Sequence, residues 1–181
     1  MKRFSFLSAI VLAAALGLAS CTGEDGLTGP AEGGNAGAQL AGSGLLGTSI
    51  ASGLLACDPL PYASGQQTIG PAGGTLVIGP HTLSVPAGAL SAPVLISGEA
   101  PVGTVNSVQL RPEGLQFAQG HPAKLTLSYA NCPLLGSLLP KRIAYTTDLL
   151  QILSYVLSVD DLIHRRITGS LEHFSRYAVA W

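Results

Sequence analysis

From Cys57 to the end of the chain, glycine and proline divide the sequence into short runs of Val, Ile, Leu and Thr. This punctuation is the feature that most limits the fold. Short runs of such residues between turn-forming residues are typical of β-strands. The pattern predicts an all-β domain that spans residues 57–181.

One pair of these runs has the spacing of a β-hairpin. Thr75–Ile78 and Thr82–Val85 flank Gly79-Pro80-His81, and glycine at the first central position suits a two-residue type II′ turn. Apolar and polar residues alternate in the second run, as expected of a half-buried strand. Further candidate strands lie at residues 94–99, 107–111, 124–129, 164–170 and 173–181. Apolar faces of this kind bury against a second sheet, so the predicted fold is an antiparallel β-sandwich.

Residues 148–159 fit two patterns. A helix would rest on the apolar residues Leu149, Ile152, Leu153 and Val156. A strand would rest on Leu153, Tyr155, Leu157 and Val159. Short apolar runs often allow both interpretations. We predict the strand, followed by a turn at Asp160-Asp161, because residues 164–170 then return as its hairpin partner.

The amino terminus has the features of an export signal. Lys2 and Arg3 precede an apolar run, Phe4–Leu18, that is too short for a comfortable membrane span. The sequence Leu18-Ala19-Ser20-Cys21 then resembles the bacterial lipobox. This resemblance implies that residues 1–20 are a lipoprotein signal peptide and that Cys21 is lipidated and holds the chain to a membrane. Thr22 favours the outer membrane of double-membraned bacteria. The alternative is a plain secreted protein that is cut near Ser20.

A glycine-rich tether is expected to follow, over residues 21–56. Ten of residues 22–56 are glycine, and a flexible coil of that length spans roughly 30 Å. The part from Leu40 to Ala56 is unusually apolar for a linker. It is expected either to dock on the domain as a short helix or strand, or to remain a flexible tether.

The number of cysteines and the net charge also fit a protein that lies outside the cytoplasm. With Cys21 lipidated, Cys57 and Cys132 are left, and an oxidising compartment favours a disulfide between them over two free thiols. No CxxC motif occurs and the four histidines lack ligand spacing, so no metal or other cofactor is expected. Without residues 1–20 the chain has seven basic and ten acidic side chains, a net charge of −3. A nucleic-acid partner is therefore not expected, and the lipid on Cys21 is the predicted membrane contact.

Two segments resemble the opening of the ZU-five domain, a module named from zonula occludens and netrin-receptor proteins. They are Ile69–Thr75, with its Gly73-Gly74 pair, and His81–Leu90, with the sequence Leu-Ser-Val-Pro-Ala-Gly-Ala-Leu. Residues 111–117 and 122–129 are similar to its middle strands. The resemblance covers about residues 69–181 and implies a β-sandwich topology used mostly for interaction.

Few residues suggest chemistry of their own. Motifs of serine hydrolases, zinc peptidases and P-loop proteins do not occur. Each remaining candidate has a plain structural interpretation, which we favour. Asp160-Asp161 would be a polar turn and not an acid pair, His81 and His121 solvated loop histidines, Arg165-Arg166 a solvated strand pair, and Tyr177 with Trp181 packing residues and not a platform for sugars.

The last candidate is His173-Phe174-Ser175. Some ZU-five proteins cleave themselves at such a sequence, and the resemblance implies attack by Ser175 on the Phe174 carbonyl with His173 as base. In a regular strand the two polar side chains share one face but stand about 7 Å apart, too far for proton transfer. A cut would also free only seven residues. We therefore expect the chain to stay intact, with no catalytic residue.

The sequence as a whole predicts a lipid-anchored lipoprotein of the bacterial cell envelope. Its β-sandwich would be a non-catalytic binding or structural module for an envelope protein or a glycan. The alternatives are a self-cleaving ZU-five-type protein and a carbohydrate-binding accessory module. A cluster of exposed aromatic side chains would favour the last of these.

Overall fold

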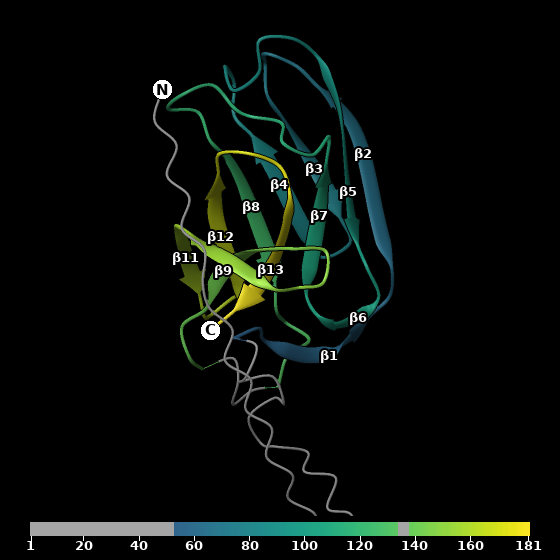
Figure 1. Cartoon of the computed structure of the whole chain (residues 1–181), viewed down its shortest axis with the longest axis vertical. Helices are drawn as coiled ribbons and strands as arrows, with labels where there is room; N and C mark the ends of the chain where they lie inside the picture. Colours follow the sequence, from purple (N-terminus) through teal and green to yellow (C-terminus); the bar gives the residue numbers. More distant parts are fainter. Residues whose placement is uncertain (1–52, 134–137) are drawn as a thin grey trace, which may run out of the picture. The chain divides into compact units, whose positions relative to one another are not determined.

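In the computed structural model, residues 53–133 and 138–181 are described, and all the regular structure in them is β-strand (Figure 1). A six-stranded sheet contains β2 (Ala63–Ile69), β5 (Val94–Ala100), β7 (Ser107–Arg111), β9 (Arg142–Thr146), β10 (Ile152–Val156) and β13 (Arg176–Ala180). Its order is β10-β9-β13-β7-β5-β2, and every pairing is antiparallel. The predicted all-β class is thus confirmed.

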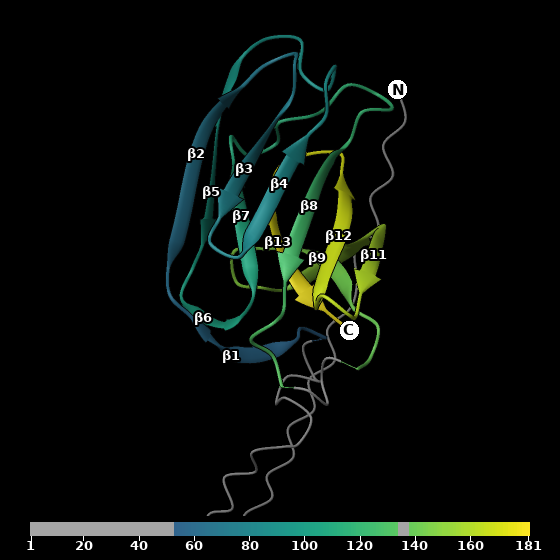
Figure 2. The same ribbon diagram turned by 180° about the vertical axis from the view of Figure 1, so that it is seen from behind.

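A five-stranded sheet forms the second layer (Figure 2). It contains β3 (Gly74–Ile78), β4 (His81–Val85), β8 (Ala123–Ser128), β11 (Ser158–Asp161) and β12 (Arg166–Leu171), in the order β11-β12-β8-β4-β3. The β3–β4 hairpin is confirmed, since Ile78 pairs with His81 across Gly79 and Pro80. Gly79 has a φ of 58°, the left-handed angle that the first central position of a type II′ turn requires.

The core lies between the two sheets and follows the predicted alternation. Leu83, Leu125 and Leu127 point inward and are fully buried, while their neighbours Thr82, Ser84 and Thr126 lie on the outer face. Burying one such leucine stabilises the fold by about 1.5–3 kcal/mol. The largest fully buried side chains are Tyr129, Tyr177, Phe174, Leu55, Ile69, Ile78, Leu83, Ile96, Leu110, Leu125, Leu127 and Ile143.

A third, two-stranded sheet closes one end of the sandwich. It pairs β1 (Ala56–Leu60) with β6 (Gly103–Val105). The predicted disulfide is present there and joins Cys57 to Cys132, with their Cα atoms 4.0 Å apart. Beside it, the amides of Asn106 and Asn131 bond each other at 2.7 and 3.2 Å, and the Asp58 amide donates to the Asn131 carbonyl at 3.1 Å. The first strand is therefore fastened to the segment that follows β8, at Asn131 and Cys132, by covalent and polar contacts.

The domain begins earlier than the predicted boundary at Cys57. Leu54 and Leu55 are buried, Leu54 bridges to Ala180, and the Leu55 amide donates to the Val179 carbonyl at 2.9 Å. Leu54 completes a second small apolar cluster on the outer face of the six-stranded sheet, with Ala144, Ala178 and Ala180. The end of the predicted tether is thus part of the domain, because Leu55 is buried in the main core and Leu54 in the smaller cluster. The rest of the tether, the signal peptide and Cys21 lie outside the described residues.

The strand interpretation of residues 148–159 is confirmed, but its apolar row is not buried. The segment forms β10 and then β11, and it passes from one sheet to the other at Leu157. Leu153 and Val159 are 55 % and 75 % exposed, because other residues of the segment make its contacts with the domain. Val156 packs against the main core, and Ile152 packs against the small cluster around Leu54. The turn also comes later than predicted, at residues 162–165.

The last strand is shorter than predicted, since β13 begins only at Arg176. A bend at Ser175 breaks the alternation, so Phe174 is buried in the main core on the same side as Tyr177. Burial of a large aromatic ring outweighs the regularity of the strand at this point.

Candidate functional site

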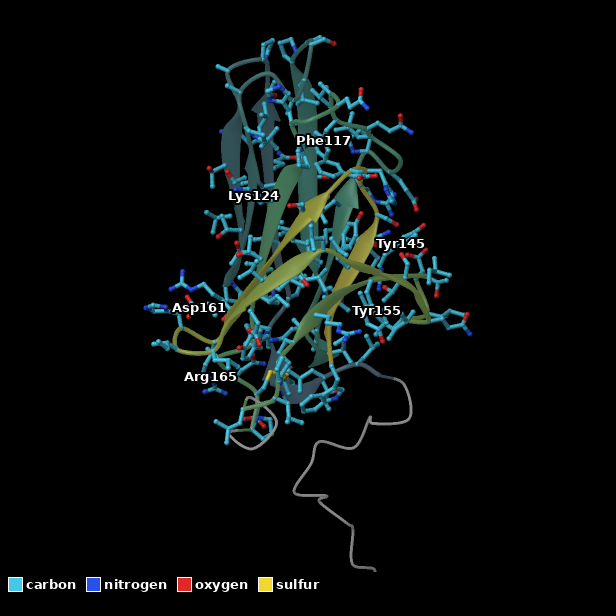
Figure 3. All side chains as sticks on the ribbon, turned by 90° about the vertical axis from the view of Figure 1, so that its left-hand side faces the viewer. Phe117, Lys124, Tyr145, Tyr155, Asp161 and Arg165 are labelled. Carbon is cyan, nitrogen blue, oxygen red and sulfur yellow. A yellow bond between two sulfur atoms is a disulfide. The ribbon has the colours of Figure 1, made fainter. Side chains whose placement is uncertain are left out.

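A groove lies at the edge of the sandwich where the chain passes from β10 to β11. It consists of two adjoining hollows, of about 580 and 470 Å³, that share Pro122, Glu172 and His173. The first hollow is lined by Gln116–Gly120, and the second by Tyr145, residues 154–157, 170–171 and Tyr177. Figure 3 shows this side of the domain, with Phe117, Tyr145 and Tyr155 labelled. We call the two hollows together the His173 groove.

Backbone bonds to the preceding loop hold His173 in place. His173 forms an isolated bridge with Gln116, and the Phe117 amide donates to the Glu172 carbonyl at 3.3 Å. Phe174 is fully buried and meets the ring of Phe117 edge-on, with centroids 5.2 Å apart. A buried aromatic anchor next to a half-buried histidine therefore fixes where the imidazole lies.

Three aromatic rings form the floor of the groove. The Tyr145 ring meets the His173 ring edge-on at 5.2 Å and the Tyr177 ring at 5.9 Å. The Tyr177 hydroxyl donates to the His173 carbonyl at 2.7 Å, and burial raises the pKa of Tyr177. Tyr177 is 1 % exposed, so it packs in the core as we favoured. The accessible aromatic surface is offered by Tyr155, which is 47 % exposed, and by the half-buried Tyr145 and His173.

The groove has the composition of a binding site. Glu172 is the single carboxylate among its lining residues, and amides of Gln116 and Gln119 add neutral polar groups. Within residues 53–133 and 138–181 no group of three His, Cys, Asp or Glu side chains could hold a metal ion. Aromatic faces with a few polar groups suit a neutral polar ligand that has apolar faces of its own.

The structure places the proposed self-cleavage sequence in a well-bonded turn. The Phe174 carbonyl accepts a bond from the Gly114 amide at 2.9 Å, and the Ser175 carbonyl accepts one from the Leu110 amide at 2.9 Å. Ser175 is 6 % exposed, and the His173 ring lies against Tyr145. The peptide that would be cut is thus held on both sides by main-chain bonds. That the chain stays intact remains a prediction.

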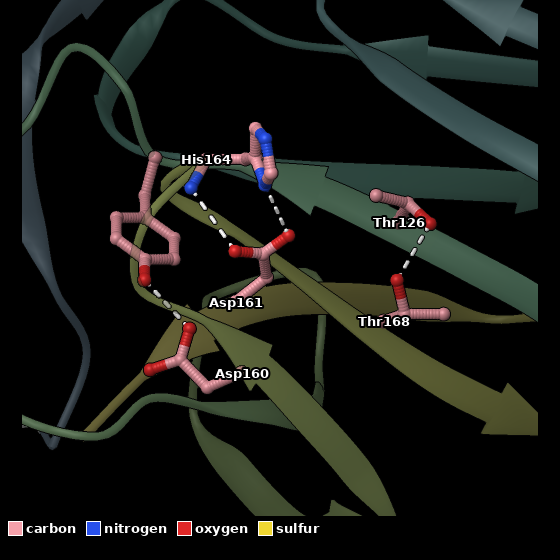
Figure 4. A network of polar contacts seen from close by, with 6 residues as sticks. Thr126, Asp160, Asp161, His164 and Thr168 are labelled. Carbon is pink, nitrogen blue, oxygen red and sulfur yellow. Dashed lines mark hydrogen bonds and ion pairs between the residues drawn. The ribbon is translucent and has the colours of Figure 1, made fainter.

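Asp160 and Asp161 end β11 and do not form the expected polar turn (Figure 4). Asp160 accepts bonds from the Tyr129 hydroxyl at 2.6 Å and from the Lys141 amide at 2.7 Å. Asp161 accepts bonds from the amide and the ring of His164, at 3.0 and 2.7 Å, and these bonds lower the pKa of the Asp161 carboxyl. The two carboxylates therefore have separate structural partners.

Trp181 packs against a lysine and not in a ligand platform. The Lys141 ammonium lies 4.3 Å from the centre of the Trp181 ring and 5.8 Å from that of Tyr129, within the range of cation–π attraction. Lys141 is 3 % exposed, and burial lowers the pKa of its ammonium group. The contact closes the end of the sandwich next to Asp160.

Two other expectations were wrong. His81 is not a solvated loop residue, because it begins β4, is 1 % exposed, and accepts a bond from the Ser128 amide at Nδ1. Arg165 is not half of a solvated strand pair, since it lies in the β11–β12 turn at a φ of 51° and donates to the Cys132 carbonyl. Arg166 is exposed at the start of β12, and His121 is exposed as predicted.

Sequence reasoning did not find Pro122, Tyr145 or Glu172 as groove residues. They come from three distant segments, and none belongs to a local motif. The one local signal was His173, which was singled out for a different chemistry.

Within the described part of the chain, no helix has the length and apolarity that a membrane span needs. Compared with known proteins, the chain matches no family model and no curated protein.

Proposed function

We propose that this chain is a membrane-anchored extracytoplasmic lipoprotein whose β-sandwich is a non-catalytic binding module, with the His173 groove as its ligand site. The observation that carries the proposal is the groove itself. It is formed by two adjoining hollows on one side of the domain and has aromatic rings on its floor. A concave surface lined by aromatic rings and a few polar groups is the usual form of a ligand site.

A binding role suits the groove better than a catalytic one. Glu172 is the single carboxylate among the residues that line the groove, so the pair of carboxylates that glycoside hydrolysis uses is not found there. The backbone bonds around His173 and Phe174 hold the floor rigid. A rigid, preformed site binds without a cost for ordering its own loops.

The anchor is proposed from the sequence Leu18-Ala19-Ser20-Cys21, and the start of the domain suits it. The Trp181 amide donates to the Gly53 carbonyl at 3.0 Å, so the point of entry is bonded to the last strand. The disulfide at Cys57 follows four residues later. A tethered domain would therefore be held firmly at the end from which the chain leaves it.

A glycan is the ligand class that we propose for the groove. Tyr145 and His173 offer ring faces, Gln116 and Gln119 offer amides, and Glu172 offers a carboxylate. Sugar rings have apolar C–H faces, which can pack on the aromatic rings, and hydroxyls, which can bond to the amides and to the carboxylate. The aromatic side chains in the groove favour a glycan ligand over a purely structural role, for which a featureless polar surface would be expected.

Two matched charge reversals test the ligand site. The full chain in detergent is titrated calorimetrically with a hexamer of β-1,4-linked N-acetylglucosamine and with soluble peptidoglycan fragments. Glu172→Lys puts a long cation into the groove and is expected to weaken binding at least tenfold. Glu99→Lys makes the same change on β5, four strands away from β10, and should bind like the unmodified chain. Equal binding by the two variants, or no binding of either probe to the unmodified chain, would refute the glycan site.

A separate experiment tests the anchor. The full chain and Cys21→Ser are expressed in a bacterium, the membranes are separated, and the mass of the amino-terminal peptide is measured. We expect an acylated Cys21 peptide from the membrane fraction. Cys21→Ser should appear as an uncut precursor or as soluble protein. A Cys21→Ser chain that is processed and retained in the membrane normally would contradict the proposal.

A further inference from the structure

The side chain of Glu172 lies where the two hollows of the His173 groove meet, since it lines both of them. The residue follows Leu171, the buried last residue of β12. The Phe117 amide donates to the Glu172 carbonyl at 3.3 Å, so the loop after β7 holds the backbone that carries the side chain. The side chain itself is exposed. The fold therefore sets the position of a carboxylate at the middle of the groove.

This carboxylate is not neutralised by an ion pair within residues 53–133 and 138–181. The ion pairs in this part of the chain join His164 to Asp161 and Arg176 to Asp148. A carboxylate that has no cationic partner in the protein is available to a cationic group of a ligand, and charged hydrogen bonds of this kind are stronger than neutral ones.

Basic side chains lie near the groove but not at its middle. Among the described residues, none of those that line the groove is lysine or arginine. The guanidinium of Arg142 lies 5.4 Å from the centre of the Tyr155 ring, so this ring already has a cation beside it. Lys124 on β8 pairs with Ser170 in the ladder, and Figure 3 shows it well away from Tyr145 and Tyr155. The place that is left for a cation of the ligand is the junction of the two hollows.

The aromatic rings beside the junction favour a cation there as well. Tyr145 and His173 line the second hollow together with Glu172, and their rings meet 5.2 Å apart. The face of a tyrosine ring attracts an ammonium group through its quadrupole. A ring and a carboxylate on the same hollow therefore attract the same kind of group.

We propose that the ligand of this groove is a glycan with free amino groups and that Glu172 is the residue that selects it. The proposal rests on the glycan site proposed above and narrows its ligand class. The protonated amine of one sugar lies at the junction and pairs with the Glu172 carboxylate, while the C–H face of a sugar ring packs on Tyr145. N-acetylation removes this charge, so an acetylated chain keeps the ring packing and the hydroxyl bonds but binds more weakly.

Two hexamers of β-1,4-linked glucosamine test the selection. One is N-acetylated and neutral, and the other is N-trimethylated and permanently charged. Each is titrated calorimetrically into the full chain in detergent, at neutral pH and low salt. We expect the charged hexamer to bind about fivefold more tightly, because it gains one partly exposed charge pair and a cation–π contact.

Two matched neutralisations locate the effect. Glu172→Gln keeps the shape of the side chain and removes its charge, so the two hexamers should then bind almost equally. Glu99→Gln removes the same charge on β5, outside the groove, and should keep the preference of the unmodified chain. Glu172→Gln should also bind the neutral hexamer as the unmodified chain does, which shows that its groove is intact.

A preference that persists in Glu172→Gln, or one that falls equally in Glu172→Gln and Glu99→Gln, would overturn the inference. In the second case net charge and not the groove would attract the charged hexamer. If the unmodified chain binds both hexamers equally, the glycan site stands and the selection by Glu172 fails. If it binds neither hexamer, the glycan site fails and the selection fails with it.

Discussion

Acid should destabilise this domain through His81. The imidazole is 1 % exposed and neutral, and its Nδ1 accepts the Ser128 amide at 3.1 Å. Burial lowers the pKa of His81 from 6.5 to about 4. Between these two values the unfolded chain takes up a proton that the folded chain refuses, so stability is complete above pH 6.5 and is lost as the pH falls toward 4.

The magnitude follows from the two pKa values. Each pH unit between them costs about 1.4 kcal/mol, so the domain should lose about 2 kcal/mol between pH 7 and pH 5 through this one group. Below pH 4 the loss levels off at about 3 kcal/mol. A protonated ring would also leave the Ser128 amide without its acceptor, because both ring nitrogens would then be donors.

Urea unfolding at pH 7 and pH 5 measures the effect, with His81→Asn as the comparison. The asparagine side-chain oxygen occupies the position of Nδ1, accepts the same amide and does not titrate. The variant should be less stable at pH 7, because the ring leaves a cavity, but should lose about 2 kcal/mol less than the parent on acidification. His121→Asn changes an exposed histidine and should behave like the parent. Equal losses for His81→Asn and the parent would refute the reasoning, since all other titrating groups are common to both.

Three other predictions concern the fold and its integrity. Cys57→Ser removes a disulfide that closes a loop of 75 residues and should lower stability by roughly 4 kcal/mol in denaturant unfolding; an unchanged midpoint would contradict this. Gly98→Ala should cost about 1–3 kcal/mol, because its Cβ would overlap Cδ1 of Ile78, whereas Gly103→Ala has open space and should change the melting temperature little. Intact mass spectrometry should give the same processed mass for the parent and Ser175→Ala, apart from the substitution; a shorter product ending at residue 174 in the parent alone would show self-cleavage.

The tertiary structure decided where the apolar strand residues point at the β10–β11 edge. Leu153 and Val159 have the alternation of a buried face, and pattern alone would put them inside. The segment passes between two sheets at Leu157, however, and its opposite side holds Val156 against the core. A period of two shows that two faces differ, but only the partner strands decide which face meets the core.

The groove likewise depends on segments that are far apart in sequence. Pro122, Tyr145 and Glu172 come together because antiparallel pairing brings β9 beside β13, and because the loop after β7 bridges to His173. The burial of His81 also depends on how the strands pair. His81 is the first residue of β4, and its ring accepts a bond from the Ser128 amide at the end of β8. A sequence motif could not reveal contacts that depend on strand order.

The amino-acid sequence by itself determined the all-β class, the Gly79 hairpin, the alternating core leucines and the pairing of Cys57 with Cys132. The all-β class and the hairpin follow from local backbone preference, and the core leucines follow from the two-residue alternation of a strand. The disulfide follows because only one pair of cysteines is left when Cys21 is lipidated. The tertiary structure alone decided the sheet order, the passage of the chain at Leu157, the His173 groove, and the exposure of Leu153 and Val159. The physical reason is that local residues set which strands form, whereas long-range packing sets which strands meet.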